Sequence, residues 1–143
     1  MKSFVAASAL AVVLGAAPAF GQGMLQSVCQ QNFAVEGTAR VTAMNFRTWR
    51  EFPNLAQPTA LKNLRAAMLA EGFSNIAVDA EAGALTAVQE TSGSGRPQTL
   101  RVSARRVGNG TRIDAVFMIQ AGQMADSNYV RNALCRIVDS ANL

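Results

Sequence analysis

Residues 70–90 read AEGFSNIAVDAEAGALTAVQE, and this stretch decides how the middle of the chain folds. Its carboxylates raise the question of whether it is a chemical site or a helix end followed by a hairpin. Gly72 follows a helical pattern and suits the left-handed position after a helix. Gly83 closes a short connection that favours a positive φ, so strands are expected at 76–79 and 84–91. We therefore interpret the stretch as a helix end and a β-hairpin.

Upstream of this stretch, the pattern predicts one strand and one helix. Residues 33–46 alternate between apolar and polar side chains, which is typical of a strand with one buried face. Residues 59–71 have helical periodicity, and Thr59 is the expected N-cap. The expected buried stripe of this helix consists of Leu61, Leu64, Met68 and Leu69.

Downstream, two more strands and a second helix are expected. Residues 98–107 and 111–120 alternate with period two around the turn sequence GNG at 108–110. Residues 127–139 carry an apolar stripe at helical spacing. The predicted fold is a two-layer α+β domain in which a mainly antiparallel five-stranded sheet carries two helices on one face. The predicted order of elements is β-α-β-β-β-β-α.

The first 21 residues predict a cleaved signal peptide. Lys2 supplies a positive charge, residues 4–17 form an uncharged apolar run, and residues 17–19 form an A-x-A cleavage pattern. The run is shorter than the roughly 20 residues that span a bilayer, so an uncleaved anchor is the weaker alternative. We expect cleavage between residues 19 and 22, no stable membrane insertion, and a periplasmic or secreted location.

The rest of the 143-residue chain is long enough for one domain and short for two. We expect an N-terminal arm at 22–32, with a short helical turn, followed by a single α+β domain at 33–143. The chain has two cysteines, Cys29 in the arm and Cys135 in the last helix. An exported protein with an even cysteine count predicts a Cys29–Cys135 disulfide, and two separate buried thiols are the alternative.

Several classes of chemistry are disfavoured by the residues present. The sequence has no histidine, which removes the commonest general base and most transition-metal sites. No phosphate-binding loop is present, so neither a cofactor nor a metal is expected. A hydrolase would have to use paired carboxylates among Asp79, Glu81, Glu90 and Asp114. Their places beside turns and arginines favour structural roles, and we expect a non-enzymatic protein.

The arginines suggest a contact surface. If Leu100, Val102 and Ala104 face the helices, alternation places their neighbours on the opposite face of the sheet. The predicted contact residues are Arg40, Arg101, Arg105 and Arg112, with Trp49 as a further candidate. Such a face suits an anionic envelope component or an envelope protein, and nucleic acid is disfavoured because few aromatic residues accompany the arginines. The alternative is an ordinary solvated face whose arginines pair with nearby acids.

Trp49 is the only tryptophan, and it lies in the aromatic and Arg-rich run FRTWREF at 46–52. Such a cluster can line an interface or a ligand mouth. A second hypothesis is therefore a small-ligand carrier with a pocket between sheet and helices and Trp49 at its mouth. Packing of Trp49 over the edge of the core is the alternative.

The opening stretch also resembles a known class of envelope domain. The pattern Leu69-x-x-Gly72-Phe73, then an Asp79 strand, then Gly83-x-Leu85-x-Ala87, is similar to helix-grip domains of BamC-type outer-membrane assembly lipoproteins. The resemblance covers about thirty residues. It implies a helix packed across an antiparallel sheet and an accessory, non-catalytic role in the bacterial envelope. The lipid-attachment cysteine of the lipoproteins is missing here, and the resemblance assigns no functional residue.

Overall fold

The computed structural model describes residues 26–90 and 96–143, so the predicted signal peptide and most of the loop expected at 92–97 lie outside the described residues. The elements in chain order are α1 (Val28–Gln31), β1 (Ala34–Glu36), β2 (Met44–Phe52), α2 (Gln57–Ala70), β3 (Ser74–Asp79), β4 (Ala84–Glu90), β5 (Pro97–Val107), β6 (Gly110–Ile119), α3 (Ser127–Asp139) and a final 3-10 turn, η1 (Ser140–Asn142). No helix in these ranges is long and apolar enough to cross a membrane.

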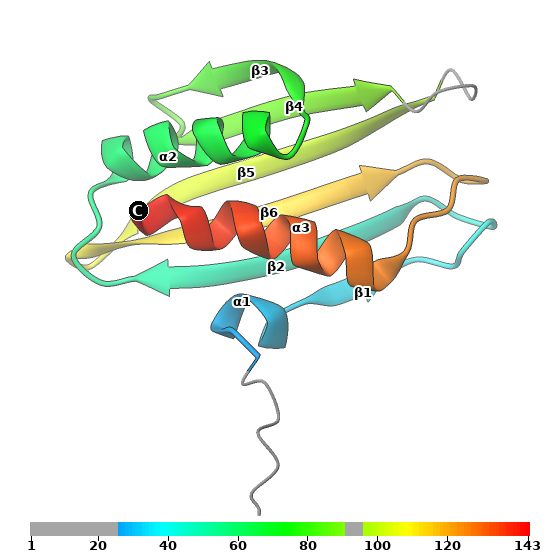
Figure 1. The fold of residues 1–143 in the computed structure, drawn as a ribbon, viewed down its shortest axis with the longest axis horizontal. Coiled ribbons are helices and arrows are strands. Elements are labelled where there is room, and N and C mark those ends of the chain that lie inside the picture. Colours follow the sequence, from blue (N-terminus) through cyan, green and yellow to red (C-terminus); the bar gives the residue numbers. More distant parts are fainter. Residues whose placement is uncertain (1–25, 91–95) are drawn as a thin grey trace, which may run out of the picture.

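The fold is α+β, with one antiparallel sheet in the spatial order β1-β2-β6-β5-β4-β3. Helices α2 and α3 lie side by side on the same face of this sheet and run in opposite directions across it (Figure 1). The predicted class is confirmed. The predicted count is wrong, because the described residues form six strands and three α-helices instead of five and two.

The extra strand arises where one long strand was predicted at 33–46. The chain turns back instead, with Gly37 at φ 106° and Arg40 at φ 67°. A side chain at Gly37 would collide with the carbonyl of Ala43, so this tight turn requires glycine. The backbone N–H of Thr38 donates to Thr42 Oγ1 at 2.8 Å and closes the turn. Alternation alone could not distinguish this hairpin from a continuous strand.

Helix α2 ends as the sequence predicts and begins earlier. Gly72 has φ 90°, and the N–H of Phe73 donates to the carbonyl of Met68 at 3.1 Å, which is the pattern of a Schellman motif. Thr59 is not the N-cap, because the helix already begins at Gln57 with Pro58 in its first turn, where a missing N–H costs nothing. Leu69, expected in the buried stripe, is 47% exposed.

Both predicted hairpins are present. Asp79 pairs with Ala84 across the β3–β4 turn, and Gly83 in that turn has φ 67°. A Cβ at Gly83 would collide with the side chain of Gln57 and the carbonyl of Ala104, so the turn sits tightly against α2 and β5. Val107 pairs with Gly110 in the β5–β6 hairpin. The acids of residues 70–90 therefore flank turns, as interpreted from the sequence.

The core is one layer between the helices and the covered face of the sheet. Leu64 and Met68 of α2 and Ile137 and Val138 of α3 are fully buried. From the sheet, alternate residues meet them, including Phe46, Leu85, Leu100, Val102, Ile113, Ala115 and Ile119. Because every second strand residue enters this layer, the remaining strand residues form a separate, open face.

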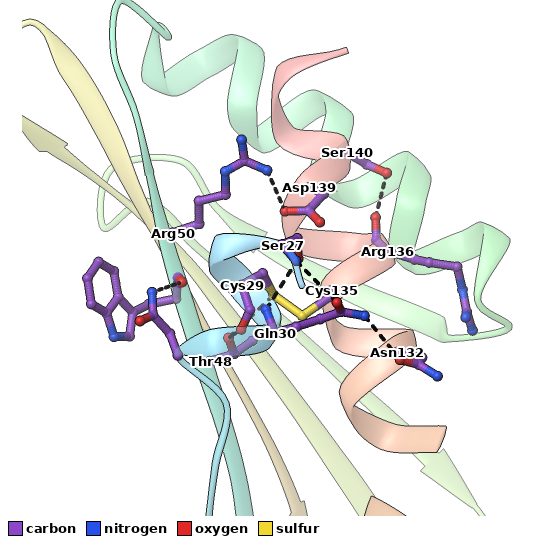
Figure 2. The surroundings of a disulfide bond; sticks show 12 residues. Ser27, Cys29, Gln30, Thr48, Arg50, Asn132, Cys135, Arg136, Asp139 and Ser140 are labelled. Atoms are coloured by element: carbon purple, nitrogen blue, oxygen red, sulfur yellow. Dashed lines mark hydrogen bonds and ion pairs between the residues drawn. A yellow bond between two sulfur atoms is a disulfide. The ribbon is translucent and has the colours of Figure 1, made fainter. Parts of the chain in front are cut away.

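The disulfide joins the N-terminal arm to the last helix. Cys29 in α1 is bonded to Cys135 in α3 across a sequence separation of 106 residues, with the Cα atoms 5.6 Å apart. Thr48 of β2 donates its buried hydroxyl to the carbonyl of Cys29, and Asn32 donates to the carbonyl of Trp49 at 3.0 Å. Figure 2 shows α1 held in this way between β2 and α3.

We predict that replacing both cysteines by alanine lowers the free energy of unfolding by about 2–5 kcal/mol, because the unfolded chain loses a long closed loop. Urea denaturation with and without reductant measures the effect. Reductant should lower the midpoint of the wild-type protein and leave that of the double variant unchanged. A wild-type protein whose thiols are labelled without reductant would contradict the disulfide.

Candidate functional site

Four of the predicted contact residues do share the open face of the sheet. Arg101 and Arg105 project from β5, Arg112 from β6 and Trp49 from β2, each out of phase with the buried residues of its strand. Arg105 lies directly beside Arg112, and Trp49 lies beside Asp114, in the registered strand pairs. The two helices lie on the other face (Figure 1).

Arg112 is engaged within this face. Its Nε and Nη2 atoms donate to the carboxylate of Asp114 at 3.0 and 2.9 Å. Its guanidinium also lies over the ring of Trp49, 4.2 Å from the ring centroid, in a cation–π contact. The hydrogen bond to Asp114 raises the pKa of Arg112 above its ordinary value. Trp49, Arg112 and Asp114 are therefore one ordered cluster.

Arg101 and Arg105 are different, because both are exposed and neither has a hydrogen bond or an ion pair with another described residue. Arg47, also on this face, pairs with Glu36 of β1 at 3.2 Å. The predicted alternative of a face neutralised by ion pairs therefore holds for Arg47 and Arg112. It does not hold for Arg101 and Arg105.

Arg40 does not belong to this face, contrary to the prediction. It occupies the turn between β1 and β2, and its Nε lies 2.9 Å from the sulfur of Met124 in the loop before α3. The prediction placed Arg40 on a strand that the structure replaces by a turn, so alternation gave it a face that it does not have.

Of the carboxylates considered for hydrolysis, Asp79 and Glu81 share the β3–β4 turn, whereas Asp114 lies on β6, apart from them. Asp79 accepts a hydrogen bond from the N–H of Ala82 at 2.9 Å, and Glu81 is exposed in the same turn. Asp114 is three strand spacings from Asp79, about 14 Å, whereas carboxylate pairs in glycosidases are about 5–9.5 Å apart. Among residues 26–90 and 96–143, no group of three or more His, Cys, Asp or Glu side chains could hold a metal ion.

A cleft of about 260 Å³ lies on the other face, between α3 and the sheet. Its walls are mainly apolar, formed by Phe73, Phe117, Ala125, Val130, Ala133, Leu134 and Ile137. Met124 and Tyr129, which also line it, are 59% and 68% exposed. Exposed apolar side chains at the edge of a concave apolar surface are typical of a binding site.

Two glutamines bring polar groups to this cleft. Gln98 of β5 and Gln89 of β4 are directly opposite each other in the sheet and both line the cleft. Gln98 is only 8% exposed, yet its side-chain amide has no hydrogen-bond partner within the described residues. The amide of Gln89 also has none there. Gln89 is exposed, and the amide atoms of Gln98 are not fully enclosed, so both amides can hydrogen-bond water or a ligand in the cleft.

The charged groups of the cleft are acidic. Asp126 accepts the N–H of Tyr129 at 2.7 Å and caps α3. Glu71 accepts hydrogen bonds from Arg136 at 2.6 and 2.9 Å, which links the end of α2 to α3 and raises the pKa of Arg136. No lysine or arginine lines the cleft among the described residues. An anionic ligand would therefore find no cation there.

Trp49 is not at the mouth of this cleft, because it lies on the opposite face of the sheet. Sequence reasoning also missed Gln98 and Gln89, although a signal was present. Each glutamine continues the inward phase of its strand, Gln98 before Leu100 and Gln89 after Ala87. A polar residue in the buried phase of a strand indicates a site where a polar group meets the core.

No protein-family model and no curated protein matches this chain. Among solved structures, the crystal structure of CalU16 from Micromonospora echinospora is similar, with 11% sequence identity and a TM-score of 0.47. The similarity covers 76% of this chain and 78% of CalU16.

We predict that the cleft accepts a larger side chain and the core does not. Ala133→Leu adds volume to the cleft and should change the free energy of unfolding by less than about 1 kcal/mol. Ala115→Leu adds the same volume in the filled layer, where Ala115 is fully buried, and should cost about 1–3 kcal/mol. Urea denaturation of both variants measures the difference, and equal losses would contradict an open cleft.

Proposed function

We propose that this protein is a carrier or binding protein for a small, mainly apolar molecule, which it holds in the cleft between α3 and the sheet. The single observation that carries the proposal is the apolar cleft of about 260 Å³ with exposed Met124 and Tyr129 at its edge. A cavity of about 150 Å³ holds benzene, so this cleft suits a ligand of on the order of ten non-hydrogen atoms.

The walls of the cleft support such a role. Phe73 and Phe117 stand in edge-to-face contact with their ring centroids 6.3 Å apart. On the other side, Ala133 contributes little volume, which leaves space where a longer side chain would have completed the packing of the core. The ion pair between Glu71 and Arg136 fixes the distance between α2 and α3 beside this space.

We further propose that the protein works after export, in the periplasm or outside the cell. The predicted signal peptide and the Cys29–Cys135 bond support this location, because disulfides persist in oxidising compartments. We also propose a non-enzymatic role. The spread of Asp79, Glu81 and Asp114 over turns and the open face supports it.

We predict that toluene binds in the cleft. Titration of the isotopically labelled protein, followed by backbone amide NMR shifts, should move the signals of Phe117, Val130 and Leu134. The indole signal of Trp49 should stay unchanged, because the sheet separates it from the cleft. Ala133→Leu should weaken toluene binding by about fivefold or more by occupying the same space.

The control for this titration is a second Ala→Leu substitution, which adds the same volume at a position outside the cleft. Ala84→Leu alters the open face of the sheet and should leave toluene binding unchanged. If toluene moves no signals at the cleft, or moves them equally in the wild-type protein and Ala133→Leu, the cleft is not a binding site.

A second function is favoured by Arg101 and Arg105, which have no hydrogen bond or ion pair with any other described residue. Arg101 and Arg105 are four residues apart on β5, so they share one face with Ser103 between them and their Cα atoms are about 13 Å apart. The half-buried Val116 and the Trp49 cluster lie beside them. Exposed arginines next to an aromatic anchor are typical of protein interfaces. We propose an acidic segment of an envelope protein as the partner of this face.

We predict that poly-L-glutamate, used as a probe for such a partner, binds this face and changes the fluorescence of Trp49. The double change Arg101→Ser and Arg105→Ser should weaken binding about fivefold or more, since it removes two free cations. Fluorescence titration at low salt measures the affinity.

The matched control is Lys62→Ser with Arg65→Ser, two exposed cations of α2 on the other face. It removes the same charge and should leave the affinity nearly unchanged. Equal losses in both double variants would show a general charge effect and would remove the proposed face.

A further inference from the structure

We propose that the cleft recognises a neutral ligand through an amide-like group, with a carboxamide or lactam edge hydrogen-bonded to Gln98 and Gln89 and an aromatic or aliphatic body against the apolar walls. This inference rests on the proposed function, because it names the class of ligand that the same cleft holds. The proposed function was argued from the volume and the apolar walls of the cleft. The present inference is argued from the two glutamines, which that argument did not use.

Gln98 carries the argument. Its side chain lies on the covered face of the sheet, in phase with the buried Leu100 and Val102, and it is only 8% exposed. No described residue hydrogen-bonds its amide. Its amide atoms keep some access to the cleft, so they can hydrogen-bond water or a ligand there. Since the amide lines the cleft, a ligand in the cleft can be that partner.

Gln89 makes the site a pair. The two glutamines are opposite each other on neighbouring antiparallel strands, so their Cβ atoms are about 5 Å apart. Each amide offers a donor N–H₂ group and an acceptor oxygen. Two such groups side by side match a ligand edge that also carries a donor and an acceptor. A carboxamide or a lactam has such an edge, whereas a hydrocarbon has none.

The charges of the cleft exclude the closest alternative, a carboxylate ligand. Glu71 and Asp126 are both acidic, and the lining has no cation to balance a third negative charge. Arg136 is occupied by Glu71, with its Nε and Nη2 atoms at 2.6 and 2.9 Å from that carboxylate. Burying a carboxylate without a cation costs far more than burying a neutral amide. Selectivity for the neutral group follows from these contacts.

Benzamide and benzoate test the inference, because they share their ring and their size and differ in the amide and the charge. NMR titration of the wild-type protein should show benzamide binding at least about fivefold more tightly than benzoate, since one neutral hydrogen bond contributes about 1 kcal/mol. Gln98→Met keeps the length of the side chain and removes the amide. It should weaken benzamide binding about fivefold and should not weaken toluene binding, because toluene makes no hydrogen bond to the amide.

Thr99→Val is the control, because Thr99 is the next residue of β5 and lies on the opposite face. It should leave both affinities unchanged. If toluene binds and benzamide binds no better than benzoate, or if Gln98→Met has no effect on benzamide, the amide site is wrong and the carrier function stands. If neither toluene nor benzamide binds at the cleft, both proposals are overturned. The comparison of the two ligands in the wild-type protein does not depend on the variant folding.

Discussion

The packing of two helices against one face of a single sheet is the constraint on which the rest of this structure depends. Strands β2, β4, β5 and β6 contribute alternate side chains to one buried layer, so the other half of their side chains must form an uncovered surface. The protein therefore presents two faces with different chemistry. One holds the core and the cleft, and the other holds Trp49 and the arginines. The disulfide adds α1 to the helical side through α3.

The cleft is a consequence of how the helical layer ends. Helix α2 terminates at the Schellman motif of Gly72, and the next residue, Phe73, lines the cleft on that side. On the other side, α3 presents the small Ala133 between larger residues. If the two helices covered the whole of this face of the sheet, Gln98 would have no cleft beside it. The sequence of residues 70–90 predicts that this helix ends at Gly72. That helix end leaves part of the sheet available to a ligand.

Sequence reasoning succeeded where local physics decides the outcome. The end of α2, the two hairpins, α3 and the Cys29–Cys135 pairing all follow from short patterns of glycine, capping residues and cysteine count. It failed where tertiary packing decides. Residues 33–46 alternate equally well as one strand or as a hairpin, and the hairpin forms around Gly37, where the turn has no room for a side chain. Arg40 was therefore assigned to the open face although it lies in a turn, whereas Trp49 lies on the open face with the arginines and not at the mouth of the cleft.

The glutamines show how a functional position can be found in such a fold. A strand that reads Gln98, Leu100, Val102, Ala104 along its buried phase breaks the rule that this phase is apolar, and the break lies where the helical cover ends. The amide keeps access to the cleft, whereas a leucine at the same position would present only apolar surface there. Water in the cleft can satisfy the amide in the free protein, so a ligand gains affinity there only if it replaces those hydrogen bonds. A purely apolar ligand displaces the water without replacing its hydrogen bonds, and this difference is the physical basis for selecting a ligand with an amide.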